Sequence, residues 1–471
     1  MAMAIPYPSY HASGLPWAPQ LPEGWQVQRN GRLFGHRVEI GFPNLPILEV
    51  SLRTGVRVRD MDNLKRKQVM SQKEKYKRAA KGDIAYNMMR MWQGAVGPAP
   101  VDGLVSPAYV VVKPYPEANS GYFSYLFRTA AYMQEVNKFS RGIVADRNRL
   151  YWESFKQMPS LVPPRPEQDQ IVAYLRAQDA HIARYIKTKR ELIALLTEQK
   201  LRIIDHAVTR GLDASVKLKP SGIEWLGEVP EHWNAVRLRQ LSTSLQTGPF
   251  GSQLHSSDYV DGGIPVINPS HLKDGIIVPD LRCAVDAETS NRLARHRLMP
   301  NDIVFARRGE LGRCALVSPQ EAGWLCGTGS LKARLRPNAI NIRFLMFSLS
   351  SPLLRGHLCL YSVGSTMDNA NTSIIGNIRI PLPPADEQQA ICDLIADECQ
   401  PLNKAIQNTE NEITLIREYR DRLIADVVTG QIDVRGWQPG PDDMVNDEDL
   451  AALGDDEECE ESAEEDDDGA D

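Results

Sequence analysis

A gapless internal repeat is the feature that most constrains how this chain can fold. A shift of 220 positions aligns two segments that begin with Pro-Pro and Glu-Gln and end with Val-Thr. The matched residues are Pro163-Pro164 with Pro383-Pro384, Glu167-Gln168 with Glu387-Gln388, Ile171 with Ile391, Glu198 with Glu418, Arg202 with Arg422 and Val208-Thr209 with Val428-Thr429. A repeated segment is a structural unit that occurs more than once, so we expect two copies of one frame.

A second match, at a shift of 208, marks where each copy begins. Ser13-Gly14, Trp17, Pro22-Glu23 and Trp25 align with Ser221-Gly222, Trp225, Pro230-Glu231 and Trp233. We call residues 13–25 and 221–233 the opening segments, and we expect their Trp side chains to be hydrophobic anchors. The residues between each opening segment and its Glu-Gln pair differ in length and sequence. The two copies therefore share their edges and differ in their interiors.

Both repeated segments have the periodicity of long amphipathic helices. Apolar residues recur at steps of three and four over 166–208 and 387–428, with near-heptad spacing. At a rise of ~1.5 Å per residue, about 40 residues would reach ~60 Å. We expect the two apolar faces to bury each other, although each helix could also lie inside a separate domain. Pro401 is expected to kink or split the second helix.

Length and composition suggest a soluble protein of several domains. The chain has 471 residues, of which 42% are hydrophobic and 24% charged, and a single core rarely fills that length. We expect a first domain at 1–160, a helix at 161–215, a second domain at 216–380, a helix at 381–437 and a disordered acidic tail at 438–471. No apolar run approaches the ~18 residues of a membrane helix. Seven cysteines without a CxxC pair favour a reducing cytoplasm.

The net charge of −6 hides a strong asymmetry. Residues 441–471 contain 17 Asp or Glu and no Lys or Arg, which leaves +11 for residues 1–440. A tail of such charge density cannot offset its ordering entropy by burial. It could mimic DNA, limit non-specific binding or act as an inert solubiliser. The basic body favours a polyanionic partner.

The first interior contains a basic stretch. Between Ser51 and Arg90 there are twelve Lys or Arg and four acidic residues, and such a stripe binds DNA by counterion release. A solvated helix face is the structural alternative. Short strands are expected at 48–52, 56–58 and 109–112, and a helix at 122–133. The candidate DNA-binding residues are Arg57, Arg59, Lys65, Arg66, Lys67, Lys73, Lys75, Lys77, Arg78 and Arg90.

The second interior alternates predicted strands with polar loops. We expect strands at 264–267, 276–278, 303–306, 313–317 and 331–335, and a helix at 342–349. Asp83-Ile84 and Asp302-Ile303 occupy corresponding places, which predicts one fold for both interiors. The loop side chains can reach bases or phosphates, although each loop could equally be ordinary turn chemistry. The candidates are Gln253, His255, Ser256, Ser257, Arg307, Arg308, Ser365, Asn369 and Asn371.

The sequence contains no motif of a catalytic site. It has no Walker loop, Rossmann fingerprint, HExxH or GxSxG elbow, and no cofactor segment or Asn/Asp-Pro-Pro-aromatic tetrapeptide of an amino-methyltransferase. We expect no catalytic residue, no metal site and no cofactor.

The arrangement of these parts resembles type I restriction-modification specificity subunits. The resemblance covers about residues 13–435 and rests on Ser221 to Trp233, on Gly248-Pro249-Phe250-Gly251-Ser252 with Asp258-Tyr259-Val260, and on the Pro-Leu-Pro-Pro to Val428-Thr429-Gly430 helix. It implies a mixed α/β fold with two target recognition domains separated by two long antiparallel helices. It further implies a non-catalytic subunit that reads a split double-stranded DNA site. Two modification (methyltransferase) subunits and motor-nuclease restriction subunits would join it, and S-adenosylmethionine, ATP and Mg would bind only to them.

Two other functions remain open from the sequence. The chain could be a repeat adaptor whose variable domains bind proteins, in which case duplex DNA would show no footprint. It could also be a self-contained methyltransferase, which would bind S-adenosylmethionine unaided.

Overall fold

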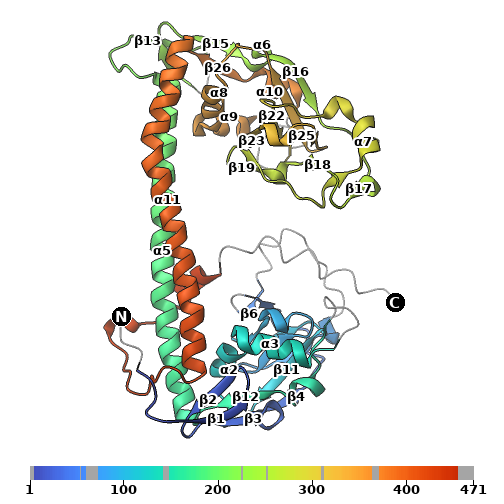
Figure 1. Cartoon of the computed structure of the whole chain (residues 1–471), viewed down its shortest axis with the longest axis vertical. Coiled ribbons are helices and arrows are strands. Elements are labelled where there is room, and N and C mark those ends of the chain that lie inside the picture. Colours follow the sequence, from blue (N-terminus) through green and yellow to red (C-terminus); the bar gives the residue numbers. More distant parts are fainter. Residues whose placement is uncertain are drawn as a thin grey trace. The chain divides into compact units, whose positions relative to one another are not determined.

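The computed structural model describes residues 5–52, 55–59, 73–141, 148–223, 226–250, 253–308, 312–362 and 371–454. The chain divides into two compact units, each of which is described by itself. Unit 1 consists of Met1–Leu192 and Thr409–Asp471, and unit 2 of Ile193–Asn408. Figure 1 shows the elements in chain order by colour.

Unit 1 is built around a four-stranded antiparallel sheet of order β4-β11-β8-β9. These strands are β4 (Phe34–Arg37), β8 (Ile84–Asn87), β9 (Val96–Pro98) and β11 (Tyr109–Pro114). Smaller pairs are formed by β1 (Tyr10–Leu15) with β2 (Ala18–Pro22), β3 (Gln26–Arg29) with β12 (Pro159–Val162), β5 (Leu48–Ser51) with β6 (Gly55–Val58), and β7 (Lys77–Ala79) with β10 (Gly103–Val105). The short helices are α1 (Asn30–Leu33), α2 (Ser120–Phe127), α3 (Ala130–Phe139) and α4 (Trp152–Phe155).

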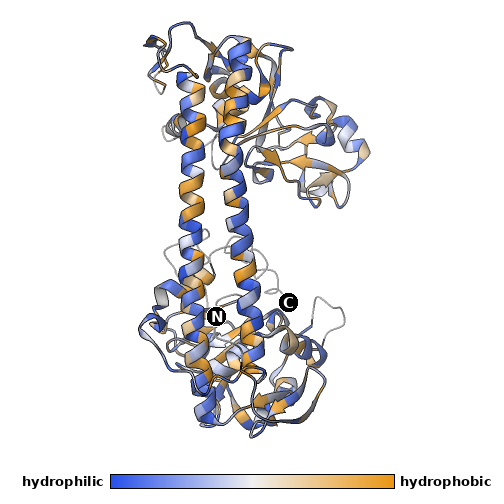
Figure 2. Ribbon diagram, turned by 60° about the vertical axis from the view of Figure 1, so that its left-hand side comes forward, coloured by the Kyte–Doolittle hydropathy of each residue, from blue (hydrophilic) through white to orange (hydrophobic). Residues whose placement is uncertain are grey.

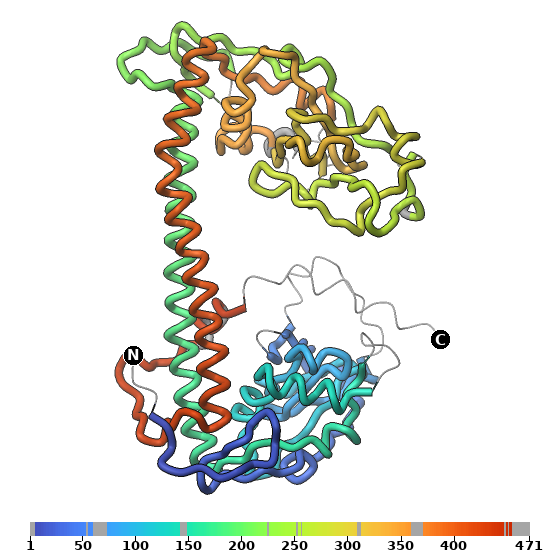
Figure 3. Tube along the Cα trace, in the orientation of Figure 1, coloured from blue at the N-terminus to red at the C-terminus, as the bar shows by residue number. Residues whose placement is uncertain are grey.

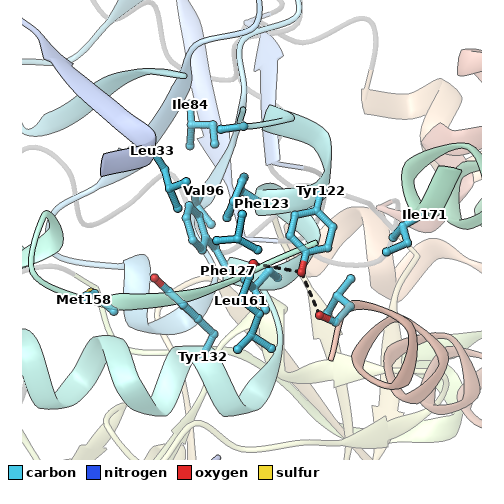
Figure 4. Packing of buried hydrophobic residues seen from close by; sticks show 14 of the residues in the cluster. Leu33, Ile84, Val96, Tyr122, Phe123, Phe127, Tyr132, Met158, Leu161 and Ile171 are labelled. Carbon is cyan, nitrogen blue, oxygen red and sulfur yellow. Dashed lines mark hydrogen bonds between the residues drawn. The ribbon is translucent and has the colours of Figure 1, made fainter. Parts of the chain in front are cut away.

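Helix α2 packs its aromatic residues into the core of unit 1. Tyr122, Phe123 and Phe127 are fully buried among strand and helix residues, as Figure 4 shows. The Tyr122 hydroxyl donates to the carbonyls of Leu161 at 3.2 Å and Val428 at 3.1 Å. One side chain thus joins the end of β12 to the end of the second long helix.

The single helix predicted at 122–133 is wrong. The chain leaves the helical conformation at Arg128 and Thr129, and the Thr129 side chain caps α3 by accepting from the Tyr132 backbone. Apolar residues continue across this break because both helices face the same core, which is why periodicity alone missed the cap.

Unit 2 repeats this architecture with a sheet of order β16-β25-β22-β23. Its strands are β16 (Ser242–Thr247), β22 (Ile303–Ala306), β23 (Cys314–Leu316) and β25 (Ser330–Leu335). A second sheet contains β17 (Tyr259–Val260), β18 (Ile264–Ile267), β21 (Ala284–Val285) and β24 (Leu325–Cys326). Further pairs are β13 (Leu218–Pro220) with β14 (Glu228–Pro230), β15 (Asn234–Arg237) with β26 (Arg379–Leu382), and β19 (Leu272–Lys273) with β20 (Ile276–Ile277). The helices are α6 (Leu238–Leu241), α7 (Ala287–Arg292), α8 (Ile342–Ser350), α9 (Pro352–Ser362) and α10 (Thr372–Asn377).

The two long helices are α5 (Arg165–Arg210) and α11 (Ala385–Val428). Hydrophobic and hydrophilic residues alternate along both, as Figure 2 shows. In unit 1, Ile171 and Leu175 of α5 share a core with Val427 and Val428 of α11. In unit 2 the opposite ends meet, since Val208 shares a core with Ile391. The helices are therefore antiparallel and bury each other, as predicted.

Pro401 does not split α11, so that part of the prediction is wrong. The helix is assigned without interruption from Ala385 to Val428, with Pro401 inside it. A proline removes one backbone hydrogen bond of the helix. The buried face around it, which includes Ile395 and Cys399, supplies the packing that keeps the flanking turns helical.

The sequence repeat corresponds to repeated contacts. The Trp25 indole donates to Glu167 Oε1 at 2.9 Å, and the Trp233 indole donates to Glu387 Oε2 at 3.0 Å. Both rings are buried, which confirms them as anchors. The Gln168 and Gln388 side chains each donate to the proline carbonyl five residues earlier, at 2.9 Å in both cases. Each unit thus docks its opening segment on the start of a long helix through the same pair of side chains. The mixed α/β fold with an internal repeat is confirmed.

After α11, the chain turns back along α5 within unit 1 (Figure 3). His181 Nε2 lies 2.7 Å from Asp443 Oδ1, and Arg184 donates to the carbonyls of Asp442 and Met444. Residues 438–454 of the predicted acidic tail therefore contact α5, while 455–471 lie outside the described residues. None of the helices in the described ranges is long and apolar enough to span a bilayer.

Candidate nucleic-acid interface

Sheet topology brings two loops of unit 2 together. Strands β16 and β22 both pair antiparallel with β25, which lies between them. Their carboxyl ends, Thr247 and Ala306, therefore lie beside the first residues of β25, Ser330 and Leu331. The segments that follow, 248–250 and 307–308, leave the sheet at the same edge.

The backbone at this edge is close-packed because it is built from glycines. Gly248 N donates to Ser330 O at 2.9 Å, and Arg307 N donates to Gly329 O at 2.9 Å. A Cβ added at Gly248 would lie 1.8 Å from the Gly327 carbonyl oxygen, and one at Gly327 would lie 2.2 Å from Asn268 Oδ1. A side chain at Gly248 or Gly327 would push the neighbouring segments apart. Because both residues are glycine, these segments can pack directly against each other.

Arg307 and Arg308 follow β22 directly, as predicted. The Arg307 guanidinium lies 5.9 Å from the centroid of the Phe250 ring, within the range of a cation–π contact. Partial burial and then the like charge of Arg308 lower the pKa of Arg307. Arg308 is exposed. Arg307 thus lies beside Phe250, which belongs to the segment that carries the family resemblance but was not among the candidate DNA-binding residues.

The polar residues after this loop are held by a neighbouring arginine cluster. Gln253 Oε1 accepts from Arg295 Nη2 at 3.1 Å, and its backbone carbonyl accepts from Arg292 Nη1 at 2.7 Å. Arg292 also pairs with Asp258 at 3.2 Å, and Asp258 accepts from the His255 backbone. His255 and Ser257 are exposed, Ser256 lies in a short 3-10 turn, and all three stay candidates.

Arg292 and Arg295 were missed by the sequence reasoning. The signal available was their spacing of three residues, which places them on one face of a helical turn.

The last predicted loop of unit 2 is described only at its end. Asn371 caps α10, where its side chain accepts from the backbones of Ser373 and Ile374 at 2.9 Å each. This is the local role that Asn commonly has at a helix start. Ser365 and Asn369 lie outside the described residues.

Several basic residues of unit 1 are paired with carboxylates. On the β5–β6 hairpin, Arg57 Nε lies 2.5 Å and Arg59 Nε 3.8 Å from Glu49. Arg78 on β7 lies 2.7 Å from Asp102 and 2.9 Å from Glu39, and these carboxylates raise the pKa of Arg78. The charges that the sequence placed in one stripe are thus partly balanced.

The other basic residues of the stripe differ in their exposure and in their hydrogen bonds. Lys77 donates to the carbonyls of Pro107 and Tyr109 at 2.7 Å, and burial lowers its pKa. Lys75 is exposed, and Lys73 and Arg90 are half-buried. Lys65, Arg66 and Lys67 lie outside the described residues. The structure brings Arg57 and Arg59 together, and all ten residues stay predictions as DNA contacts.

No group of three or more His, Cys, Asp or Glu side chains in the described part of the chain is arranged to hold a metal ion.

Comparison with known proteins finds a family that part of the chain resembles. Residues 230–415 match the family model described as type I restriction modification DNA specificity domain. The matched range contains the β16–β22 loops and α11 as far as Leu415. Over that range the chain is similar to the DNA specificity domain of type I restriction-modification systems, and its relatives include type I restriction enzyme specificity subunits.

Two relatives show how far the likeness extends. The chain is 23% identical over 285 residues to the type I restriction enzyme MjaVIII specificity subunit of Methanocaldococcus jannaschii, a match that covers 60% of this chain and 64% of that relative. It is 23% identical over 353 residues to the EcoKI specificity subunit of Escherichia coli K12, covering 73% of this chain and 72% of that subunit. The match to the first relative thus spans less than two thirds of its length.

A solved structure supports the fold. It is described as the structural basis underlying complex assembly and conformational transition of the type I R-M system. The TM-score is 0.54 at 15% sequence identity, and the alignment covers 88% of this chain and 99% of that one.

Proposed function

We propose that this chain is the DNA-sequence-specificity subunit of a type I restriction-modification complex and binds a bipartite, asymmetric site. The observation that carries the proposal is the combination of a repeated frame with unlike interiors. Both units hold their opening Trp on a long helix by the same indole–carboxylate contact. The loops at the sheet edge differ, since the positions after β8 are Met88 and Met89 and those after β22 are Arg307 and Arg308. Two units with the same frame and different loops are suited to bind two different half-sites.

The chemistry of the unit 2 loops supports DNA contact. Arg presents a planar donor fork that fits the O6 and N7 acceptors of guanine or two phosphate oxygens. Arg308 is exposed beside Arg307. In unit 1, Arg57, Arg59 and Arg78 are paired with carboxylates, so we assign backbone contacts there to the exposed Lys75 and to the basic residues of 60–72.

The long helices supply a spacer. Helices of 46 and 44 residues are longer than ordinary domain helices. We infer that they set the gap between half-sites, near one helical turn or ~34 Å. Adding or removing one heptad in both helices should change the gap and leave the half-sites intact. An unchanged gap would refute the spacer role.

The catalytic work belongs to partner subunits in this proposal. Two modification subunits and the motor-nuclease restriction subunits would dock on this chain in the cytoplasm. S-adenosylmethionine, ATP and Mg would bind to those subunits, and this chain would supply no catalytic group.

Nuclease footprinting of the chain with its modification subunits tests the proposal. Two protected blocks with a fixed gap are expected. Protection by neither the chain nor the complex would favour a protein-binding adaptor and refute DNA recognition.

A substitution in unit 2 assigns one half-site to it. Arg307→Ala with Arg308→Ala should weaken binding about 10- to 100-fold, which corresponds to the loss of one bidentate contact at ~1–3 kcal/mol. The loss should disappear on a duplex whose second half-site is scrambled. Gel-shift titration measures both duplexes, and an equal loss on each would count against the assignment.

A further inference from the structure

The segment 292–297 of unit 2 places several cations close to one another. Its sequence is Arg-Leu-Ala-Arg-His-Arg, and it runs from the end of α7 through a short 3-10 turn. Arg292 and Arg295 are exposed, and Arg297 is half-buried. Like charges repel one another unless anions neutralise them. The acceptors of these guanidinium groups therefore decide whether the segment can take an external anion.

Arg295 differs from Arg292 in the charge of its acceptors. Arg292 pairs with the Asp258 carboxylate at 3.2 Å. Arg295 donates from Nη2 to the Gln253 amide oxygen at 3.1 Å and from Nε to His296 Nε2 at 2.9 Å. Burial, and then the charge of Arg295, lower the pKa of His296 to about 4, so its ring is neutral near pH 7. Within the described ranges Arg295 forms no ion pair with a carboxylate, and its Nη1 group remains for an external acceptor.

The backbone that carries Arg295 is fixed by a buried lysine. Lys332 is 2% exposed, and its ammonium donates to the carbonyls of Arg295 at 2.8 Å and Arg297 at 2.7 Å. Lys332 is the third residue of β25 and pairs with Gln246 of β16 and Val304 of β22. Arg295 is therefore held near the start of β25, at the sheet edge from which the loops after β16 and β22 leave.

A fixed arginine without a carboxylate partner suits a phosphate. Phosphate oxygens accept from the planar guanidinium, often through two N–H groups. Arg297 donates to two neutral side chains, Ser290 at 3.3 Å and Asn291 at 2.5 Å, so its charge favours an anion at the same place. Contacts to DNA phosphates position a protein on the duplex and carry no sequence information directly.

We propose that Arg295 is a phosphate-contacting residue of unit 2, which binds the backbone of the duplex beside the second half-site and reads no base. The inference rests on the proposed function and deepens it. It separates a contact that sets affinity from Arg307 and Arg308, which are proposed to set sequence preference.

The test measures binding at several salt concentrations between ~50 and ~200 mM, with the full chain in complex with its modification subunits. Each phosphate contact on B-DNA contributes about −0.9 to the slope of the logarithm of the binding constant against the logarithm of the salt concentration. Arg295→Ala and Arg295→Gln should each make this slope less steep by about 0.9 and weaken binding about tenfold. Arg295→Lys should keep most of the slope, because an ammonium also binds phosphate.

The sequence of the duplex separates a phosphate contact from a base contact. The loss in Arg295→Ala should be equal on the selected site and on a duplex whose second half-site is scrambled. The loss in the Arg307→Ala, Arg308→Ala variant should disappear on the scrambled duplex.

Two control variants exclude other causes of a changed slope. Arg282→Ala removes the same charge from unit 2, but the Arg282 guanidinium pairs with Asp280 at 3.1 Å and its side chain is 83% exposed, so the slope should stay as in the wild type. Gln253→Ala removes an acceptor of Arg295 without removing a charge, and it should also keep the wild-type slope.

The inference is overturned if Arg295→Gln keeps the wild-type slope, or if Gln253→Ala reduces the slope as much as Arg295→Ala does. A loss that occurs only with an intact second half-site would make Arg295 a base-reading residue and would also contradict the inference. If the wild-type complex binds no duplex, the proposed function itself fails.

Discussion

The two units place different chemistry at one position of the same helix pair. The 220-residue shift aligns Asp179 with Cys399 and Arg420 with Lys200. In unit 1, Arg420 Nε lies 2.6 Å from Asp179 Oδ1, and the Tyr125 hydroxyl donates to the same carboxylate at 2.8 Å. In unit 2, Cys399 lies instead in an apolar cluster with Ile391 and Ile395.

This difference shows which contacts the frame requires. The Trp–Glu and Gln–carbonyl contacts recur in both units because they dock the opening segment and start the long helix. The contact between the two helices at Asp179 or Cys399 can be made in either of two ways. Unit 1 uses an ion pair and unit 2 uses apolar packing. A buried ion pair is costly to desolvate and adds little net stability over an apolar pair.

The largest expected effect comes from breaking the ion pair on one side. Asp179→Ala should lower the free energy of unfolding by about 3 kcal/mol, because the mostly buried Arg420 would keep only the exposed Asp421, at 3.7 Å, as a partner. The matched change Cys399→Ala should cost about 1 kcal/mol, the loss of a small buried group. Urea denaturation of the full chain measures both, and equal costs would show that the ion pair has no special role.

The recurring Trp–Glu contact should respond equally in both units. Trp25→Phe and Trp233→Phe each remove one indole donor to a carboxylate while keeping an aromatic ring. A hydrogen bond to a charged group is worth about 2 kcal/mol. Each variant should therefore lose about that much by the same measurement. If only one variant lost stability, the Trp–Glu contact would contribute to the free energy of unfolding in one unit and not in the other, although the sequence repeats it.

A further expected effect is a pH dependence that comes from His296 in unit 2. Burial, Arg295 and Lys332 lower the pKa of His296 to about 4, and Arg295 Nε donates to its Nε2 at 2.9 Å. The unfolded chain binds a proton near pH 6.5, so the folded state loses stability as the pH falls from about 6.5 toward about 4.

Comparison with His296→Gln isolates this group from the carboxylates. The difference in unfolding free energy between wild type and variant should shrink by about 2 kcal/mol from pH 7 to pH 5. If the difference in unfolding free energy between wild type and His296→Gln does not change with pH, the folded state does not favour the neutral form of His296.

Much of the frame was predictable because it depends on local periodicity and on the repeat. The strands at 264–267 and 303–306 were predicted to the residue, and both long helices within a few residues. The break at Thr129 was not, because periodicity does not reveal the local cap. The continuity through Pro401 was not, because it depends on packing against residues far along the chain.

The candidate interface was predicted less completely. Arg307 and Arg308 were found because they follow a strand that periodicity located. Phe250 was part of the segment that carries the family resemblance, but its exposure of 57% was not predicted. The pairing of Arg78 with Glu39 and Asp102 joins residues 24 to 39 positions apart, and no spacing rule relates them.

The central claim is that unlike loops on a repeated frame read unlike half-sites. Selection and sequencing of duplexes bound by the complex tests it most directly, with wild type beside the Arg307→Ala, Arg308→Ala variant. Two different sequence blocks at a fixed gap are predicted, with only one block relaxed in the variant. A single block, or relaxation of both blocks together, would contradict the account.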